Sequence, residues 1–369
     1  MRYHLRTAKG LTGRPPAGAP AEPPARAPAG SRPEGPPGAA APSRLRGAPG
    51  PRARWRICAA AVTPLLLVAG VVAGVAAPAS ATTVPAPPSG WTTVFGDDFS
   101  GAAGSAVDSN WTYDTGTQYN GTGCTASYGT GEVESNTSST ANVAEDGNGH
   151  LNITPVNSGG SWTSGRIETT AGDFEAPAGG ELEVSASIEQ PNPASGLGYW
   201  PAFWMLGDGF RSSGAGTSGT MDCASWPSTG EIDIMEDVNA QSDLYGTFHC
   251  GTDPGGPCNE TNGLGSGATA CSGCQTGYNT YSAIINRTDT SNESITFLLN
   301  GNAYYTVTES QVGASTWQAA VDHGFFLILD LAMGGGFPNG VCGCTSPDGS
   351  TSSGAAMSVG YVAVYQTSS

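Results

Sequence analysis

Residues 294–307 read SITFLLNGNAYYTV, two alternating apolar and polar runs on either side of Asn300-Gly301. Alternation with a period of two places the apolar side chains on one face of a strand, and Asn-Gly is typical of a two-residue hairpin turn. The stretch therefore predicts two antiparallel strands. The same texture recurs in 181–188, 325–329 and 357–365. No helical period of useful length interrupts it, so we expect an all-β fold of two packed sheets.

The composition limits the classes of protein that fit. The 369 residues include 55 Gly and 27 Pro, and only 12% are charged, which argues against a helical bundle. Residues 82–369 carry three basic side chains against 29 acidic ones, a net charge of −26. Because nucleic-acid binding depends on Lys and Arg that neutralise phosphates, this imbalance excludes nucleic acid as a partner.

The chain divides into three segments. Residues 1–56 are rich in Pro, Ala and Arg and have no periodicity, so we expect a disordered extension. Residues 57–81 are mainly apolar, follow a basic stretch and end in Ala79-Ser80-Ala81, which predicts a secretory signal peptide cleaved after Ala81. An N-terminal membrane anchor is the alternative. Residues 82–369 are then one secreted, monomeric domain without stable membrane association.

Export would place the remaining eight cysteines in an oxidising compartment, where disulfides are the default. We expect two bridges that close local loops, Cys250 to Cys258 and Cys271 to Cys274. A zinc site built from these four cysteines is the alternative. Cys342 and Cys344 are expected to have separate partners, since a bridge between residues two apart is strained.

The densest acid cluster is GEIDIMED at 230–237. Strand alternation places Glu231 and Asp233 on one face, with two isoleucines in the core behind them. Glu236 breaks the alternation and would enter the core, where an unpaired charge is very costly. We therefore predict a β-bulge at Met235 that returns Glu236 to the acidic face.

Three carboxyl groups on one face indicate proton chemistry. Two leaning glutamates can approach to roughly the 5 to 5.5 Å of a retaining glycosidase pair, and like charges keep one of them protonated as a general acid. An acidic strand on a solvated face, or a calcium site, is the alternative.

Aromatic side chains flank these acids. Trp200 and Trp204 share one face of their run, and Trp226 precedes Glu231 by five residues. Exposed indoles stack on sugar rings, although core packing is the commoner fate of tryptophan. His249 could hydrogen-bond a substrate hydroxyl or Asp233, and a structural histidine is the alternative.

These residues together resemble glycoside hydrolase family 16, on its bulged, laminarinase-like branch. The blocks that carry the resemblance are EIDIME at 231–236, WPAFWMLG at 200–207 and shorter ones at 95–101, 128–134, 164–167, 246–249 and 325–335. The resemblance implies a jelly-roll β-sandwich of the concanavalin A-like type with an open concave cleft. It also implies retaining endo-hydrolysis of a β-linked polysaccharide, foremost β-1,3-glucan.

Position by position, the resemblance assigns roles to the acids. Glu231 corresponds to the nucleophile, Asp233 to the assisting aspartate and Glu236 to the general acid/base. The positions that line the negative subsites correspond to Trp204, Trp226, Arg166 and His249. No cofactor is implied. Family members usually have Asp where this chain has Gly360, and because that Asp helps to hold a structural calcium, no metal is expected here.

Two other functions compete with a glucanase. Within the family, the substrate could be β-1,3-galactan or another galactan. Outside the enzymes, jelly rolls also serve as carbohydrate-binding modules and lectins. The intact set of Glu231, Asp233 and Glu236 argues against the second alternative, since binding alone needs no such trio.

Overall fold

The computed structural model describes residues 83–211 and 220–369, which belong to one compact unit. The expected extension 1–56, the signal segment 57–81 and its cleavage site lie outside the described residues. Within the described ranges, no helix is both long and apolar enough to cross a bilayer.

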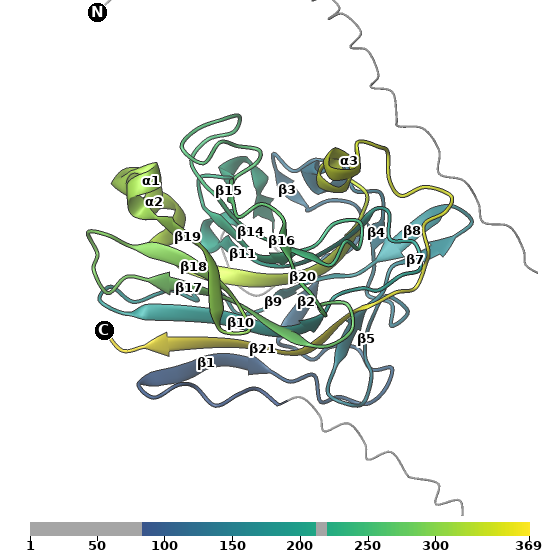
Figure 1. Ribbon diagram of the computed structural model, residues 1–369, viewed down its shortest axis with the longest axis horizontal. Coiled ribbons are helices and arrows are strands. Elements are labelled where there is room, and N and C mark those ends of the chain that lie inside the picture. Colours follow the sequence, from purple (N-terminus) through teal and green to yellow (C-terminus); the bar gives the residue numbers. More distant parts are fainter. Residues whose placement is uncertain (1–82, 212–219) are drawn as a thin grey trace, which may run out of the picture. The chain divides into compact units, whose positions relative to one another are not determined.

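Two large antiparallel sheets form the two layers visible in Figure 1. The first has the strand order β19 (Asn302–Thr308), β18 (Ser294–Leu299), β17 (Asn279–Asn286), β10 (Glu181–Glu189), β21 (Met357–Thr367), β6 (Leu151–Ile153) and β5 (Val143–Glu145), with β1 (Trp91–Asp97) also paired to β21. The second has the order β15 (Leu264–Gly265), β14 (Asp243–His249), β13 (Glu231–Glu236), β11 (Tyr199–Gly207), β20 (Phe325–Met333), β9 (Arg166–Thr169) and β2 (Trp111–Tyr113), with β16 (Thr269–Ala270) also paired to β14.

Alternation explains how the sheets meet. Val184 and Phe297 of the first sheet and Phe203 and Phe248 of the second are fully buried in one shared hydrophobic core. The hairpin predicted from Asn300-Gly301 joins β18 to β19, and both of its turn residues have positive φ. The expected sandwich of two sheets is therefore confirmed.

Smaller elements lie at the margins of the sheets. The described residues include three short helices, which leave the expected all-β class of the fold unchanged. Their bounds are α1 (Glu309–Val312), α2 (Ala314–Val321) and α3 (Gly336–Cys342). The minor strands and 3-10 helices are β3 (Gly121–Thr122), β4 (Ser135–Asn136), β7 (Val156–Ser158), β8 (Ser161–Ser164), β12 (Met221–Asp222), η1 (Ala126–Gly129), η2 (Asp208–Phe210) and η3 (Cys223–Ser225).

The eight cysteines of the described residues form four disulfides. Two are the expected local bridges, Cys250–Cys258 and Cys271–Cys274, and their formation rules out zinc at these cysteines. The others are Cys124–Cys223 and Cys342–Cys344. The expectation of separate partners for Cys342 and Cys344 was wrong. Gly343 between them has a left-handed φ of 62°, and this turn places the two Cα atoms 5.2 Å apart, within the usual range.

Candidate active site

A β-bulge in β13 places the predicted acids. In the ladder with β11, Asp233 pairs with Trp204 and Met235 with Phe203, so that Ile234 is the extra residue. The bulge is thus confirmed, but Ile234 rather than Met235 lacks a partner in this ladder. Both side chains are fully buried, which explains the bulge: two successive apolar residues turn inward and Glu236 returns outward.

The neighbouring strand accommodates the bulge with a glycine. Asp233 pairs with Thr247 and Glu236 with Tyr245, so that only Gly246 of β14 opposes the two bulged residues. A Cβ atom at Gly246 would lie 2.5 Å from the Tyr304 hydroxyl and 2.8 Å from the Phe297 ring. A side chain there would push the strand away from the opposite sheet.

Each glutamate of the site has an indole N–H as a hydrogen-bond donor. Nε1 of Trp226 lies 3.1 Å from Oε2 of Glu231, and Nε1 of Trp200 lies 2.8 Å from Oε1 of Glu236. The exposed fraction of the side chain is 16% for Glu231, and Glu236 as a residue is 7% exposed. The two acids are therefore held in position and largely withdrawn from water.

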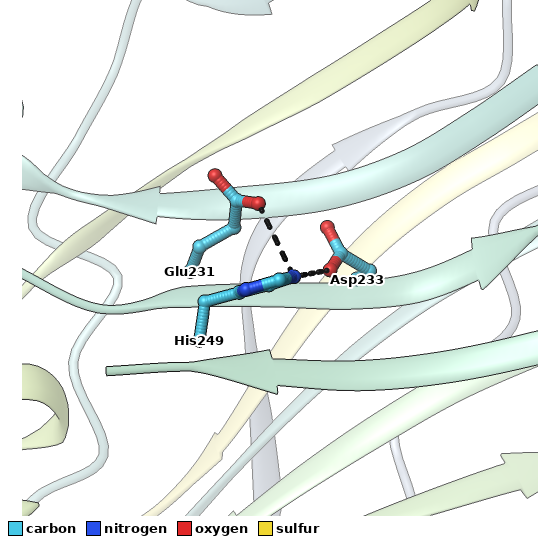
Figure 2. Close-up of side chains that lie close together, drawn as sticks. All are labelled: Glu231, Asp233 and His249. Atoms are coloured by element: carbon cyan, nitrogen blue, oxygen red, sulfur yellow. Dashed lines mark ion pairs between the residues drawn. The ribbon is translucent and has the colours of Figure 1, made fainter. Parts of the chain in front are cut away.

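His249 faces Glu231 and Asp233, as Figure 2 shows. Its Nε2 lies 3.3 Å from Oδ2 of Asp233 and 3.9 Å from Oε1 of Glu231. Its Nδ1 lies 2.7 Å from Oε2 of Glu260, and the Trp226 ring packs at a centroid distance of 5.6 Å. Of the two contacts expected for His249, the one with Asp233 is present.

Burial dominates the electrostatics of this wall. It raises the pKa of Glu231 to about 8, with the charge of Asp233 adding to the increase and His249 opposing it. Burial and Asp233 raise the pKa of Glu236 well above its usual value, and the Trp200 hydrogen bond opposes this only in part. This direction favours the protonated form of Glu236, which is the form that a general acid needs.

The histidine shifts in the direction that favours its charge. Burial alone would lower the pKa of His249, but the hydrogen bonds to Asp233 and Glu260 outweigh it and raise the pKa well above the usual value. These contacts favour the imidazolium form of His249, and a positive charge beside Glu231 favours the ionised carboxylate there.

Trp204 lies on β11 and Arg166 on β9, and β20 lies between these two strands. The guanidinium of Arg166 packs 4.8 Å from the Trp204 ring, and Nε1 of Trp204 donates to Oδ1 of Asp330 at 2.9 Å. Arg166 also pairs with Asp330 at 3.5 Å and donates to the hydroxyl of Tyr119 at 2.6 Å. Because Arg166 is only 4% exposed, it supports Trp204 from within the protein.

On the other side of the acids, an aromatic cluster surrounds Glu236. Phe337 of α3 packs edge-on against Trp200 and Tyr245 at centroid distances of 5.8 and 5.0 Å. Trp200 is also the donor to Glu236. Aromatic side chains therefore flank the acids on both sides, through Trp226 and Trp204 on one and this cluster on the other.

One group of side chains among the described residues has the spacing of metal ligands. Ligand atoms of Glu231, Asp233 and His249 lie within 4.8 Å of one another. Ion pairing of His249 with the two acids also accounts for that proximity. At the position of the family's structural calcium, Gly360 of β21 has no side chain, and Asp97 of β1 already accepts bonds from the Phe99 backbone N–H and Trp111 Nε1.

Two further residues of the site were not predicted from the sequence. Glu260 contacts His249 from a loop. Trp200 donates a hydrogen bond to Glu236, whereas the sequence predicted only the face on which Trp200 lies. The signal for Glu260 was the expected Cys250–Cys258 loop, since a bridge that closes this loop brings an acid two residues beyond it near His249.

The structure resembles solved glucanases. An endo-1,3-β-glucanase from Streptomyces sioyaensis is 50% identical, with 78% of this chain and all of that chain covered and a TM-score of 0.70. A non-specific endo-β-1,3(4)-glucanase from glycoside hydrolase family 16 is 25% identical, with 79% and 97% covered and a TM-score of 0.55. These neighbours confirm the jelly-roll sandwich. No family model matches the sequence.

Among curated proteins, a keratan-sulfate endo-1,4-β-galactosidase from Sphingobacterium multivorum is 33% identical over 187 residues, which are 51% of this chain and 36% of that protein. The chain spans about a third of the length of this and two further curated relatives, at 36%, 38% and 34%.

Proposed function

The chain belongs to glycoside hydrolase family 16, and from that premise we propose that it is an endo-β-1,3-glucanase that acts by a retaining double displacement. Laminarin-like and mixed-linked β-glucans are its substrates. The observation that carries the proposal is the pair of buried glutamates on one face of β13, each with an indole donor, between aromatic side chains.

In the first step, a carboxylate oxygen of Glu231 attacks the anomeric carbon while the protonated Glu236 donates its proton to the glycosidic oxygen. The bond from the anomeric carbon to that oxygen breaks, the reducing-end fragment leaves as an alcohol, and a covalent glycosyl ester forms on Glu231. The raised pKa of Glu236 supports its role as proton donor.

In the second step, Glu236 is ionised and accepts a proton from water while the water oxygen attacks the anomeric carbon. The ester bond to Glu231 breaks, and the two glutamates regain their starting protonation states. Asp233 lies between them in sequence and shares His249 with Glu231, so it assists by orienting that histidine. Trp204, Trp226 and His249 then line the negative subsites, with Arg166 behind Trp204.

We also propose that the enzyme is secreted as a monomer after removal of residues 1–81. The basic and apolar pattern before Ala81 supports export. The four disulfides of the described residues are consistent with an oxidising compartment.

A galactan is the second candidate substrate. The observation that favours it is the 33% identity with a protein named as an endo-β-galactosidase. Glucose and galactose differ in one hydroxyl configuration, so the same acids serve either sugar and the lining side chains decide.

A polymer panel tests substrate and mechanism together. We expect the purified chain to release reducing sugar from laminarin and lichenan, and NMR of the fresh product to show the β-anomer first. Release from galactan or agarose alone would favour the second candidate. An α-anomer formed first would contradict retention, and binding without hydrolysis would identify a carbohydrate-binding module instead.

A further inference from the structure

Glu260 is a fully buried acid outside the family's acid triad. Its side chain has no exposed surface, and it lies just after the loop that the Cys250–Cys258 disulfide closes. An isolated β-bridge between Gly255 and Glu260, with both N–O distances at 2.6 Å, fixes the end of this loop. The loop therefore holds the Glu260 carboxylate in one place.

Both oxygens of Glu260 are used, and both contacts lead to the active site. Oε1 accepts the backbone N–H of Cys250 at 2.9 Å, and Oε2 lies 2.7 Å from Nδ1 of His249. On its other side, His249 faces Asp233 and Glu231 of β13, and the uncharged Trp226 packs on its ring. One histidine thus lies among three carboxylates.

We propose that Glu260 is a positioning residue that keeps His249 cationic and aims its Nε2–H at Asp233 and Glu231, which favours the ionised, nucleophilic form of Glu231. This proposal rests on the proposed function for the role of Glu231. The protonation of His249 itself does not depend on any activity. A carboxylate at Nδ1 fixes the ring orientation as it does in other buried acid–histidine pairs.

The isosteric variant Glu260→Gln separates charge from shape. The amide oxygen can still accept the Cys250 N–H, which turns the amide NH₂ toward Nδ1 of His249. A donor at that position requires an unprotonated Nδ1, so the ring becomes neutral with its proton on Nε2. Glu231 then loses an adjacent positive charge and its pKa rises.

Nitrogen NMR of the wild-type chain tests the proposal without a variant. With ¹⁵N-histidine labelling, we expect both ring nitrogens of His249 to stay protonated at pH 7, above the ordinary histidine pKa of about 6.5. Variants of His4, and of His150 and His323, which lie away from the site, assign the other signals. A neutral His249 at pH 7 would overturn the proposal, whether or not the protein hydrolyses glucan.

The pH dependence of kcat/KM on laminarin tests the consequence. We expect Glu260→Gln to move the acidic limb upward by about one pH unit, the low end of the effect of an opposite charge at 4–6 Å. Asp253→Asn is the matched control, since it removes the same charge from an exposed position in the same loop. An unmoved acidic limb, or an equal shift in both variants, would refute the inference. An inactive wild-type protein would instead refute the proposed function.

Discussion

Two groups of buried charge in this protein differ in how their charges are balanced. The acid wall (Glu231, Asp233 and Glu236) has one histidine and two indoles as its close partners. The arginine cluster lies elsewhere and joins the buried Arg287 to the buried Glu293 at 3.0 Å, to Asp322 at 3.1 Å and to the exposed Glu175 at 3.2 Å.

The difference lies in the cation. Arginine stays charged under all conditions in which the protein folds, so Arg287 gives its acids a permanent partner. Histidine can release its proton, and in the acid wall it is shared with Glu260. The arginine cluster is therefore structural, although burial still raises the pKa of Asp322 to about 6, whereas in the acid wall burial raises the pKa of Glu231 to about 8 and that of Glu236 well above its usual value.

The largest effect is expected for Glu231→Gln. The amide cannot act as a nucleophile, so turnover of laminarin should fall by about 10⁴-fold or more. The fold should remain intact, because the change removes one of several crowded negative charges. Steady-state rates and the thermal unfolding midpoint measure the two effects. Appreciable residual kcat in the folded variant would remove Glu231 from the mechanism.

Arg287→Met should have the opposite effect to Glu231→Gln: the protein should lose stability and keep its activity. It leaves Glu293 and Asp322 without their cation, which costs about 3 to 5 kcal/mol for a buried pair. Urea unfolding measures the loss, and kcat/KM at 25 °C should stay near the wild-type value. Adding Glu293→Gln should restore part of the stability. If the single variant is as stable as wild type, the cluster has no structural importance.

The strands and the bulge that form the acid wall could be predicted from the sequence, because strand alternation is a local pattern. The pattern predicted the strands that include 181–188 and 294–299, and Glu236 predicted a bulge. Which residue is unpaired depends on both neighbouring strands, and no local pattern encodes that. Glu260 was missed for a related reason: its contact with His249 depends on a closed loop and not on periodicity.

Asp237 directly follows β13. It tests how burial changes the pKa of an acid whose hydrogen-bond donors are backbone N–H groups. It is fully buried and has the backbone N–H groups of Ser242 and Asp243 as donors, and burial raises its pKa from the usual 3.8 to about 7. A raised pKa means that its contribution to stability is complete below pH 4 and is lost as the pH rises through about 7.

Asp237→Asn should therefore flatten the decline in unfolding free energy between pH 4 and 8, by on the order of 3 kcal/mol. Urea titrations of both proteins across this range measure the difference. The exposed Asp253→Asn serves as the control and should follow wild type. Parallel curves for Asp237→Asn and wild type would show that Asp237 is ionised in the fold.

The smallest effect is expected at Asp330. This buried acid lies in the active-site sheet and pairs with an arginine, so it is intermediate between the acid wall and the arginine cluster. Asp330→Asn keeps an oxygen for the Trp204 N–H but loses the charge 3.5 Å from Arg166, which still has Asp114 at 3.6 Å. Because Trp204 stays in place, KM for laminarin oligosaccharides should change less than tenfold and kcat should stay constant. Asp330→Ala also removes the acceptor, worth about 0.5 to 1.5 kcal/mol, and should raise KM further. Equal KM values for the two variants would mean that the ion pair, and not the hydrogen bond, holds the indole.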